Sequence, residues 1–112
     1  MRNWGKWEYK ENSEIRQLID KADDLQGYSE IMKEIYNICN RYLRIFEKEN
    51  RDDIEDLIEF IFLIEDETEV DNLEEYSNDI ENYGFNDIEE LIDGRLYEFW
   101  NLMDDYNIFI DL

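Results

Sequence analysis

Histidine and proline are absent from this chain of 112 residues, and Cys39 is its only cysteine. The missing histidine excludes the commonest general base near neutral pH and every serine–histidine or cysteine–histidine nucleophile. A single cysteine excludes an intramolecular disulfide and any zinc site built from cysteines. We therefore expect no enzymatic activity and no cofactor.

Basic residues are almost missing from the second half of the chain. Residues 52–112 hold twenty-two Asp and Glu against one basic residue, Arg95, which gives −21, the charge of the whole protein. Residues 1–51 hold ten acidic and ten basic residues and balance at zero. Solubility needs a net charge of only about 2–8 in magnitude on a small domain, and concentrated like charge weakens the fold. The excess therefore predicts an electropositive partner.

Long apolar runs are also missing. The longest, Phe60–Ile64, is far shorter than the roughly 20 residues that span a bilayer, and the first residues lack the apolar run of a signal peptide. These features favour a cytoplasmic protein. Anionic lipid and nucleic acid would both be repelled by residues 52–112, so we expect neither membrane binding nor direct nucleic-acid binding.

The apolar residues that are present predict a folded helical protein. Hydrophobic residues make up 43% of the chain, enough for a core despite the acidity, and their spacing mostly follows the helical period. We expect residues 1–112 to form a single acidic helical domain, mainly α, folded as a compact bundle of four to five helices. Period-two alternation around Trp7 and towards Leu112 leaves open a short two-stranded ribbon from the termini.

Apolar stripes and capping signals place the helices. Asn12 or Ser13 would cap the first helix, and Gly27 would end it. Gly84 would end the fourth helix, and Asn86 or Asp87 would cap the last. The run Phe60–Ile64 allows a buried strand, but its continuity with the preceding stripe favours a central helix contacted on several sides. The expected ranges are about 13–25, 30–50, 52–67, 71–83 and 87–103.

Two features of the second predicted helix each have a structural and a functional interpretation. Cys39 lies in the apolar stripe, where a small buried residue is favoured over a reactive thiol. A row of basic residues at helical spacing could contact phosphate, but we favour its pairing with carboxylates of the second half. This basic row consists of Arg41, Arg44, Lys48 and Arg51.

The carboxylates themselves carry little information about catalysis. Pairs of carboxylates can hydrolyse glycosides or hold two metals, yet so many acidic residues form close pairs by chance. The densest stretch, Glu65–Asp71, lacks the glycine of a calcium-binding EF-hand loop. We therefore expect no catalytic residue and no dedicated metal site.

The acidic residues are instead predicted to form a partner-binding face. About two carboxylates per helical turn would point outward, one charge every ~2.7 Å, against one per ~1.7 Å of axis in duplex DNA. Tyr76 and Tyr83 lie among them, either as aromatic anchors or as boundary packing. A merely solvated acidic surface would leave the split between the two halves unexplained. The acidic candidates are Asp52, Asp53, Glu55, Asp56, Glu59, Glu74, Glu75, Asp79, Glu81, Asp87, Glu89, Glu90 and Asp93.

Two stretches are typical of this acidic character: DDIEDLIE at Asp52–Glu59 and NDIEELID at Asn86–Asp93. Together with the small size and the lack of histidine and proline, they resemble small phage DNA-mimic inhibitors, including anti-CRISPR proteins. The resemblance implies an inhibitor that fills the nucleic-acid channel of a basic target in a bacterial host cell, often a CRISPR effector nuclease. Two alternatives stay open, a toxin-immunity protein that neutralises a basic toxin such as a nuclease, and a subunit of a larger assembly.

Overall fold

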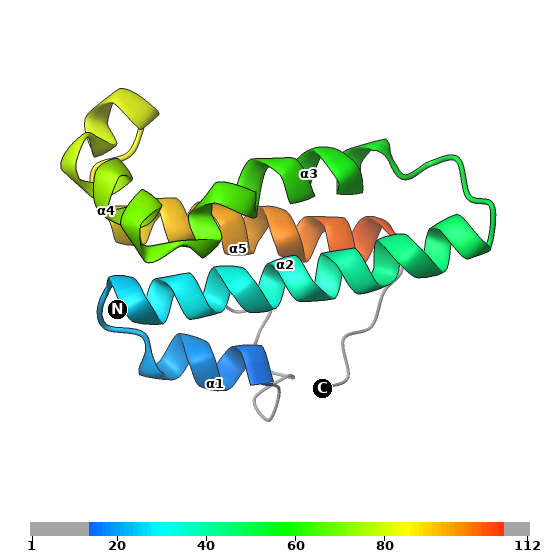
Figure 1. Cartoon of the computed structure of the whole chain (residues 1–112), viewed down its shortest axis with the longest axis horizontal. Coiled ribbons are helices and arrows are strands. Elements are labelled where there is room, and N and C mark those ends of the chain that lie inside the picture. Colours follow the sequence, from blue (N-terminus) through cyan, green and yellow to red (C-terminus); the bar gives the residue numbers. More distant parts are fainter. Residues whose placement is uncertain (1–13, 107–112) are drawn as a thin grey trace.

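Helices account for nearly all of the chain that the structure, a computed structural model, describes: residues 14–106 (Figure 1). In chain order they are α1 (Glu14–Lys21), α2 (Leu25–Lys48), α3 (Glu55–Glu65), η2 (Asp66–Thr68), α4 (Val70–Asn78), η3 (Ile80–Tyr83) and α5 (Ile88–Asp105), where η marks a 3-10 helix. The mainly α fold is confirmed, with no strand in the described range. The ribbon suggested for the termini lies outside the described residues.

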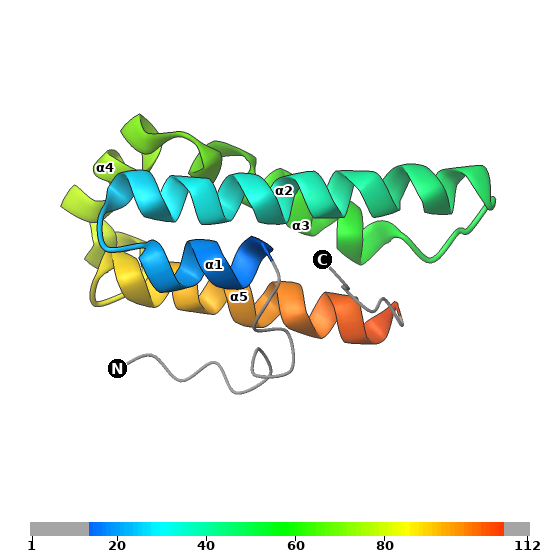
Figure 2. The same cartoon turned by 90° about the horizontal axis from the view of Figure 1, so that it is seen from below.

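The long helix α2 organises the bundle. It contacts α1, α3, α4 and α5, and these helices lie around it when the molecule is seen from two directions (Figures 1 and 2). The chain reverses after α2, so that α3 runs back along it, and α5 then runs antiparallel to α3 (Figure 1). The start of α3 and the helix α4 therefore lie at opposite ends of the bundle.

The core is built from the predicted apolar stripes. On α2, Ile31, Ile35 and Cys39 are fully buried, and on α3 Leu57 and Ile64 meet them from the other side of the same core. The stripe of the last helix is confirmed as well, because its members are buried along the length of α5. These buried residues are Leu91, Ile92, Leu96, Phe99, Trp100 and Met103.

The boundary between the first two helices differs from the prediction. Gly27 lies in the first turn of α2, which begins at Leu25 and is capped by Asp24, whose carboxylate accepts the Gly27 N–H at 2.9 Å. A Cβ at Gly27 would lie 2.9 Å from the Cα of Ala22. Glycine is therefore required by the close approach of α1 to α2, and the prediction that it ends the first helix was wrong.

The apolar run Phe60–Ile64 is helical, so the strand alternative is wrong. The helix α3 begins later than predicted, at Glu55, and the residue before it, Ile54, has no side-chain acceptor that could cap it. The helix α3 contacts α2, η2 and α5, as the prediction of contact on several sides requires, but it is not covered all round. Phe62 is 70% exposed and Leu63 45% exposed, so one side of α3 has an apolar surface without a neighbour among the described residues.

The predicted helix at 71–83 divides into two pieces. The backbone leaves helical geometry at Asp79, with α4 before it and η3 after it. Gly84 follows in the left-handed region, with φ at 87°, where glycine is favoured. Of the two predicted caps, Asn86 and Asp87, it is Asp87 that caps α5, since its carboxylate accepts the Glu90 N–H at 2.8 Å.

Candidate functional site

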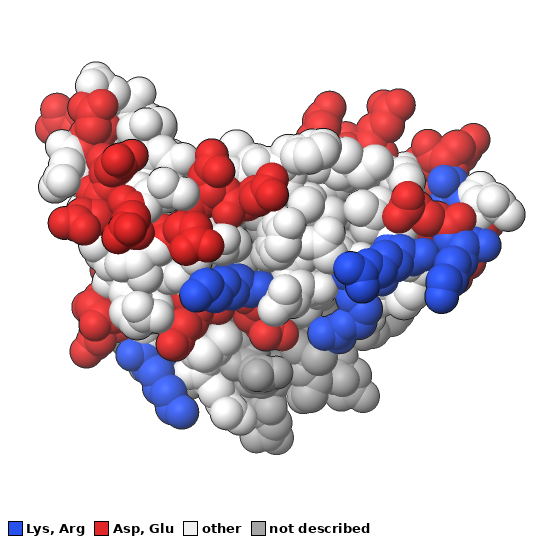
Figure 3. Space-filling model, viewed as in Figure 1, with Lys and Arg blue, Asp and Glu red and all other residues white. Residues whose placement is uncertain are grey.

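The predicted acidic residues form two clusters at opposite ends of the bundle. The α3 cluster lies at and before the start of α3, and the α4 cluster lies on α4, η3 and the first turns of α5. Figure 3 shows acidic side chains towards both ends of this face, with mainly uncharged surface between them. The α3 cluster consists of Asp52, Asp53, Glu55, Asp56 and Glu59. The α4 cluster consists of Glu74, Glu75, Asp79, Glu81, Asp87, Glu89, Glu90 and Asp93.

Most of these side chains are exposed, although two in the α4 cluster are not. Glu89 and Asp93 are half-buried on α5, because they turn towards the bundle, whereas the other eleven acidic candidates are exposed. These two residues are therefore poorly placed for direct contact with a partner. The remaining carboxylates keep their access to solvent.

The charge density along each helix is lower than predicted. The helix α3 carries four exposed carboxylates in 11 residues, or one every ~4 Å, because Phe62 and Leu63 occupy outward positions. The exposed carboxylates of α4 number three in 9 residues, a similar spacing. The spacing predicted from the sequence was wrong. The charge spacing along a single helix is therefore close to that of one DNA strand, ~3.4 Å, and wider than that of the duplex.

An ion pair compensates part of the α3 cluster, whereas three exposed glutamates of the α4 cluster have no such pair with a described side chain. Arg51 binds Asp53 through two hydrogen bonds, Nε to Oδ1 at 3.0 Å and Nη2 to Oδ2 at 2.8 Å. In the α4 cluster, Glu74, Glu75 and Glu81 form no ion pair with any side chain that the structure describes. The strongest uncompensated negative surface therefore lies at the α4 end.

The basic row pairs with the second half at only one position. Arg51 binds Asp53 and also lies over the Phe46 ring, 4.3 Å from its centroid. Arg41, Arg44 and Lys48 are exposed on α2 and form no ion pair within the described range. The predicted pairing is thus found at Arg51 alone, because the row lies on the outer face of α2 and the carboxylates of α3 project elsewhere. Figure 3 shows this row as a blue band.

Local hydrogen bonds fix the carboxylates at the start of α5. The Asn86 side-chain amide donates to the Glu90 carboxylate at 2.9 Å, and Asp87 accepts the Glu90 backbone N–H. The positive end of the α5 dipole offsets part of the repulsion between neighbouring acidic residues there. This turn therefore presents its charge in a defined orientation.

Tyr76 and Tyr83 pack against each other at the α4 end. Their ring centroids are 4.7 Å apart, with an edge-to-face angle of 75°. Tyr76 is half-buried, and burial together with Asp66 and Glu67 raises its pKa. Tyr83 is 51% exposed, and its ring rests against that of Tyr76. Tyr76 thus matches boundary packing, whereas Tyr83 is available for contact.

Comparisons with protein-family models, curated proteins and solved structures give no match to this chain. Its function is therefore inferred from the acidic surface described above. In residues 14–106, no helix is both long and apolar enough to cross a membrane. Within the same range, no three cysteine or acidic side chains are placed so that they could hold a metal ion.

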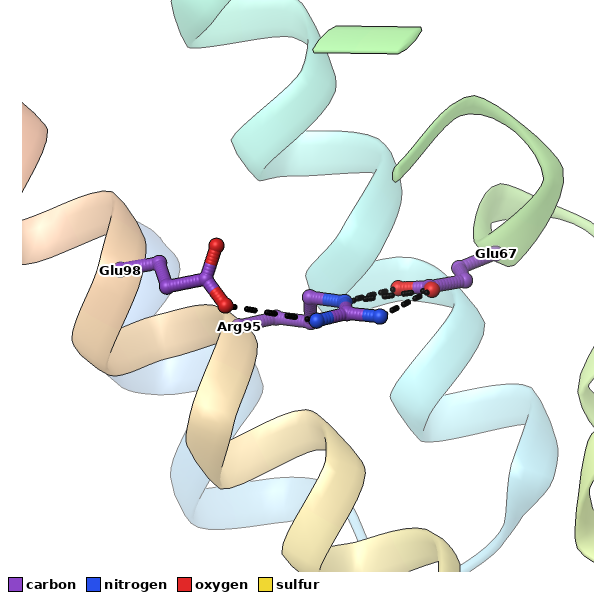
Figure 4. A network of polar contacts seen from close by, with 3 residues as sticks. All are labelled: Glu67, Arg95 and Glu98. Atoms are coloured by element: carbon purple, nitrogen blue, oxygen red, sulfur yellow. Dashed lines mark hydrogen bonds and ion pairs between the residues drawn. The ribbon is translucent and has the colours of Figure 1, made fainter. Parts of the chain in front are cut away.

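An ion pair that the sequence analysis missed connects the α4 end to the rest of the bundle (Figure 4). Arg95 on α5 donates to Glu67 on η2 through Nε at 2.9 Å and through Nη2 at 3.0 Å. Both side chains are largely buried, with 13% and 5% exposed, and Glu98 lies 3.4 Å from Nη1. The isolated cation on the last helix was the one available signal, since no spacing rule connects residues 28 positions apart.

Burial dominates the electrostatics of Glu67. It raises the pKa of the Glu67 carboxyl, and Arg95 offsets only part of that effect. An unpaired carboxylate at this position would be costly, and Arg95 reduces that cost because it favours the ionised form of Glu67. The pair holds η2 against α5, immediately before the chain enters α4. It therefore helps to orient the α4 cluster.

Proposed function

We propose that this protein is a non-enzymatic inhibitor that binds a basic nucleic-acid-handling protein by nucleic-acid mimicry, with a CRISPR effector nuclease as its target. The observation that carries the proposal is the α4 cluster. There, the exposed carboxylates of Glu74, Glu75 and Glu81 form no ion pair with a described side chain. Concentrated charge of this kind destabilises the chain that carries it, which a partner-binding role would explain.

The geometry of the α4 cluster suits a partner that binds phosphates. Its helices carry charge at about the spacing of one nucleic-acid strand. A rigid array loses little conformational entropy when it binds, and the Asp87 cap and the Arg95–Glu67 pair both limit movement at this end. Arg and Lys side chains that bind phosphate oxygens can bind carboxylate oxygens in the same bidentate manner. The α4 cluster could therefore occupy a channel that evolved for nucleic acid.

Binding of this kind should be fast and sensitive to salt. Complementary charge accelerates association at low ionic strength, and the Debye length of about 8 Å at physiological salt limits that attraction. Tyr83 adds an exposed aromatic ring beside the carboxylates, a residue type enriched in interface hot spots. The expected complex thus combines electrostatic steering with a small apolar contact.

DNA cleavage by guide-loaded Cas9-type effectors, titrated with this protein, tests the proposal. We expect inhibition that saturates near one protein per effector and weakens as salt rises. Replacing Glu74 and Glu75 with glutamine should raise the concentration needed by at least tenfold. The matched control neutralises Glu47 and Glu49, two exposed glutamates near the basic row at the other end of the bundle, and should change little.

Three outcomes would count against the proposal. Absence of inhibition across the effectors would remove a CRISPR target, and inhibition of a basic nuclease toxin alone would favour the immunity alternative. Equal losses from the two double variants would show that net charge, rather than the α4 cluster, controls binding.

A further inference from the structure

A groove between α3 and α5 combines an apolar floor with an acidic rim. It has a volume of about 480 Å³ and is lined by one face of each helix. The lining positions repeat with the same spacing on both helices, from Asp56 to Leu63 on α3 and from Glu98 to Asp105 on α5. Eight helical residues span about 10 Å, so the groove is two turns long.

The floor of the groove is unusually apolar for so acidic a surface. Phe60 lies at its base, and Leu63 and Leu102 form its sides. Leu63 is 45% exposed although it belongs to the apolar run of α3. No described element covers these side chains. The groove is therefore an apolar surface that folding of residues 14–106 leaves open.

The rim of the groove carries only negative charge. Asp56 and Glu59 line it from α3, and Glu98 and Asp105 line it from α5. Glu98 also lies 3.4 Å from Arg95, but no basic side chain lines the groove itself. The helices α3 and α5 are antiparallel (Figure 1). Asp56 and Asp105 therefore lie at one end of the groove, and Glu98 lies towards the other. An occupant therefore meets carboxylates at both ends of a short apolar surface.

We propose that this groove binds a short cationic amphipathic helix of the basic partner. An apolar side chain of that helix would rest on Leu63 and Leu102, and flanking Lys or Arg side chains would reach the rim. Their aliphatic stems would cover the floor while their charged ends met the carboxylates. Nucleic acid and anionic membranes are repelled by the rim, and so is a second copy of this chain, with its own charge of −21.

This inference rests on the proposed function and makes it more specific. Mimicry by carboxylates alone predicts affinity that disappears at high salt, because exposed charges are screened. Apolar burial in the groove is not screened by salt. The complex should therefore keep part of its affinity where a purely electrostatic complex would dissociate.

Backbone amide NMR of the full chain, titrated with designed peptides, tests the groove directly. The probe is an 18-residue helical peptide of leucine and lysine with leucine on one face, and its control replaces every leucine with glutamine. We expect the leucine peptide to shift amides around Leu63 and Leu102 and to remain bound at 0.5 M NaCl. The control peptide should give diffuse shifts that disappear at that salt concentration.

Two pairs of variants separate the groove from the general acidity. Leu63→Gln should weaken the leucine peptide by about tenfold, whereas Phe62→Gln, on the same helix but outside the groove, should leave its affinity unchanged. Glu59→Gln should weaken it more than Glu55→Gln, although both variants lose one charge from α3.

Either of two results would overturn the inference: equal effects within each pair of variants, or shifts that do not map to the groove. The outcome for the proposed function is read separately in the cleavage assay. If Leu63→Gln inhibits as well as the wild type does at both low and high salt, mimicry stands and the groove is removed. Peptide binding in the groove without inhibition of any nuclease removes the proposed function instead.

Discussion

Arg95→Met should destabilise the protein strongly, because it leaves the Glu67 carboxylate buried without its cation. Removing one partner of a buried pair costs about 3 kcal/mol, the lower end of the usual range, since Arg95 is partly exposed. A chain of 112 residues unfolds with an entropy of about 2.1 cal/mol/K per residue, so this loss should lower the Tm by about 12 °C. Thermal and urea unfolding followed by circular dichroism would measure it.

The loss should also depend on pH. Burial already raises the pKa of Glu67, and removing Arg95 raises it further. The folded variant then takes up a proton that the unfolded chain does not, so its stability falls as pH rises. Each pH unit changes the free energy by at most about 1.4 kcal/mol, so the loss should shrink by up to ~2 kcal/mol from pH 7.5 to pH 6.

Two variants control for other causes. Arg51→Met makes the same change in net charge at an exposed pair and should destabilise the protein much less than Arg95→Met, with no change between pH 6 and 7.5. The double variant Arg95→Met with Glu67→Gln removes both charges and should recover most of the loss. A cost for Arg95→Met no larger than that of Arg51→Met, or one constant between pH 6 and 7.5, would refute the reasoning.

Three further predictions concern stability and reactivity. Gly27→Ala should lower the free energy of unfolding by about 1–2 kcal/mol, because the added Cβ would lie 2.9 Å from the Ala22 backbone. Gly94→Ala, whose Cβ would have its nearest contact at 3.6 Å, should raise the free energy of unfolding by up to about 1 kcal/mol. Chemical denaturation measures both, and a loss at Gly94 as large as that at Gly27 would contradict the packing argument. Burial raises the pKa of Cys39 to about 12, so a thiol reagent at pH 8 should modify it only after urea unfolds the chain, and rapid modification of the folded protein would show an open core. For the wild type, the raised pKa of Glu67 predicts a higher Tm at pH 5.5 than at pH 7, because the stability from this group is complete below its unfolded pKa and is lost as pH rises through its folded pKa. Moderate salt at pH 7 should also raise the Tm, because it screens the repulsion between carboxylates. A Tm that stays flat or falls under both changes would contradict these expectations.

The parts of the fold that could be predicted from sequence are those set by short-range signals. The stripe of α5 from Leu91 to Met103 has one apolar face, Asp87 caps it, and Gly84 supplies the left-handed residue before it. Each signal lies within a few residues of its effect. Periodicity and capping rules are therefore sufficient for such elements.

The rest depends on contacts between distant residues or on competing local signals. Gly27 fits a helix end by type, but the close approach of Ala22 and the cap from Asp24 place it inside α2. The apolar run of α3 predicts burial, although the bundle has no helix to cover Leu63. For the candidate site, the acidic composition was evident, but its division into two clusters depends on the direction in which α3 runs.

The central claim is that the acidic surface competes with nucleic acid for one site on a basic protein. Its most direct test is to immobilise this protein, load it with bacterial lysate at low salt, and elute with duplex DNA or RNA at constant ionic strength. Polyglutamate of equal total charge is the control eluent. We expect nucleic acid to release a basic nuclease much more efficiently than polyglutamate does. Equal release by the two polyanions, or a retained partner that nucleic acid does not displace, would contradict it.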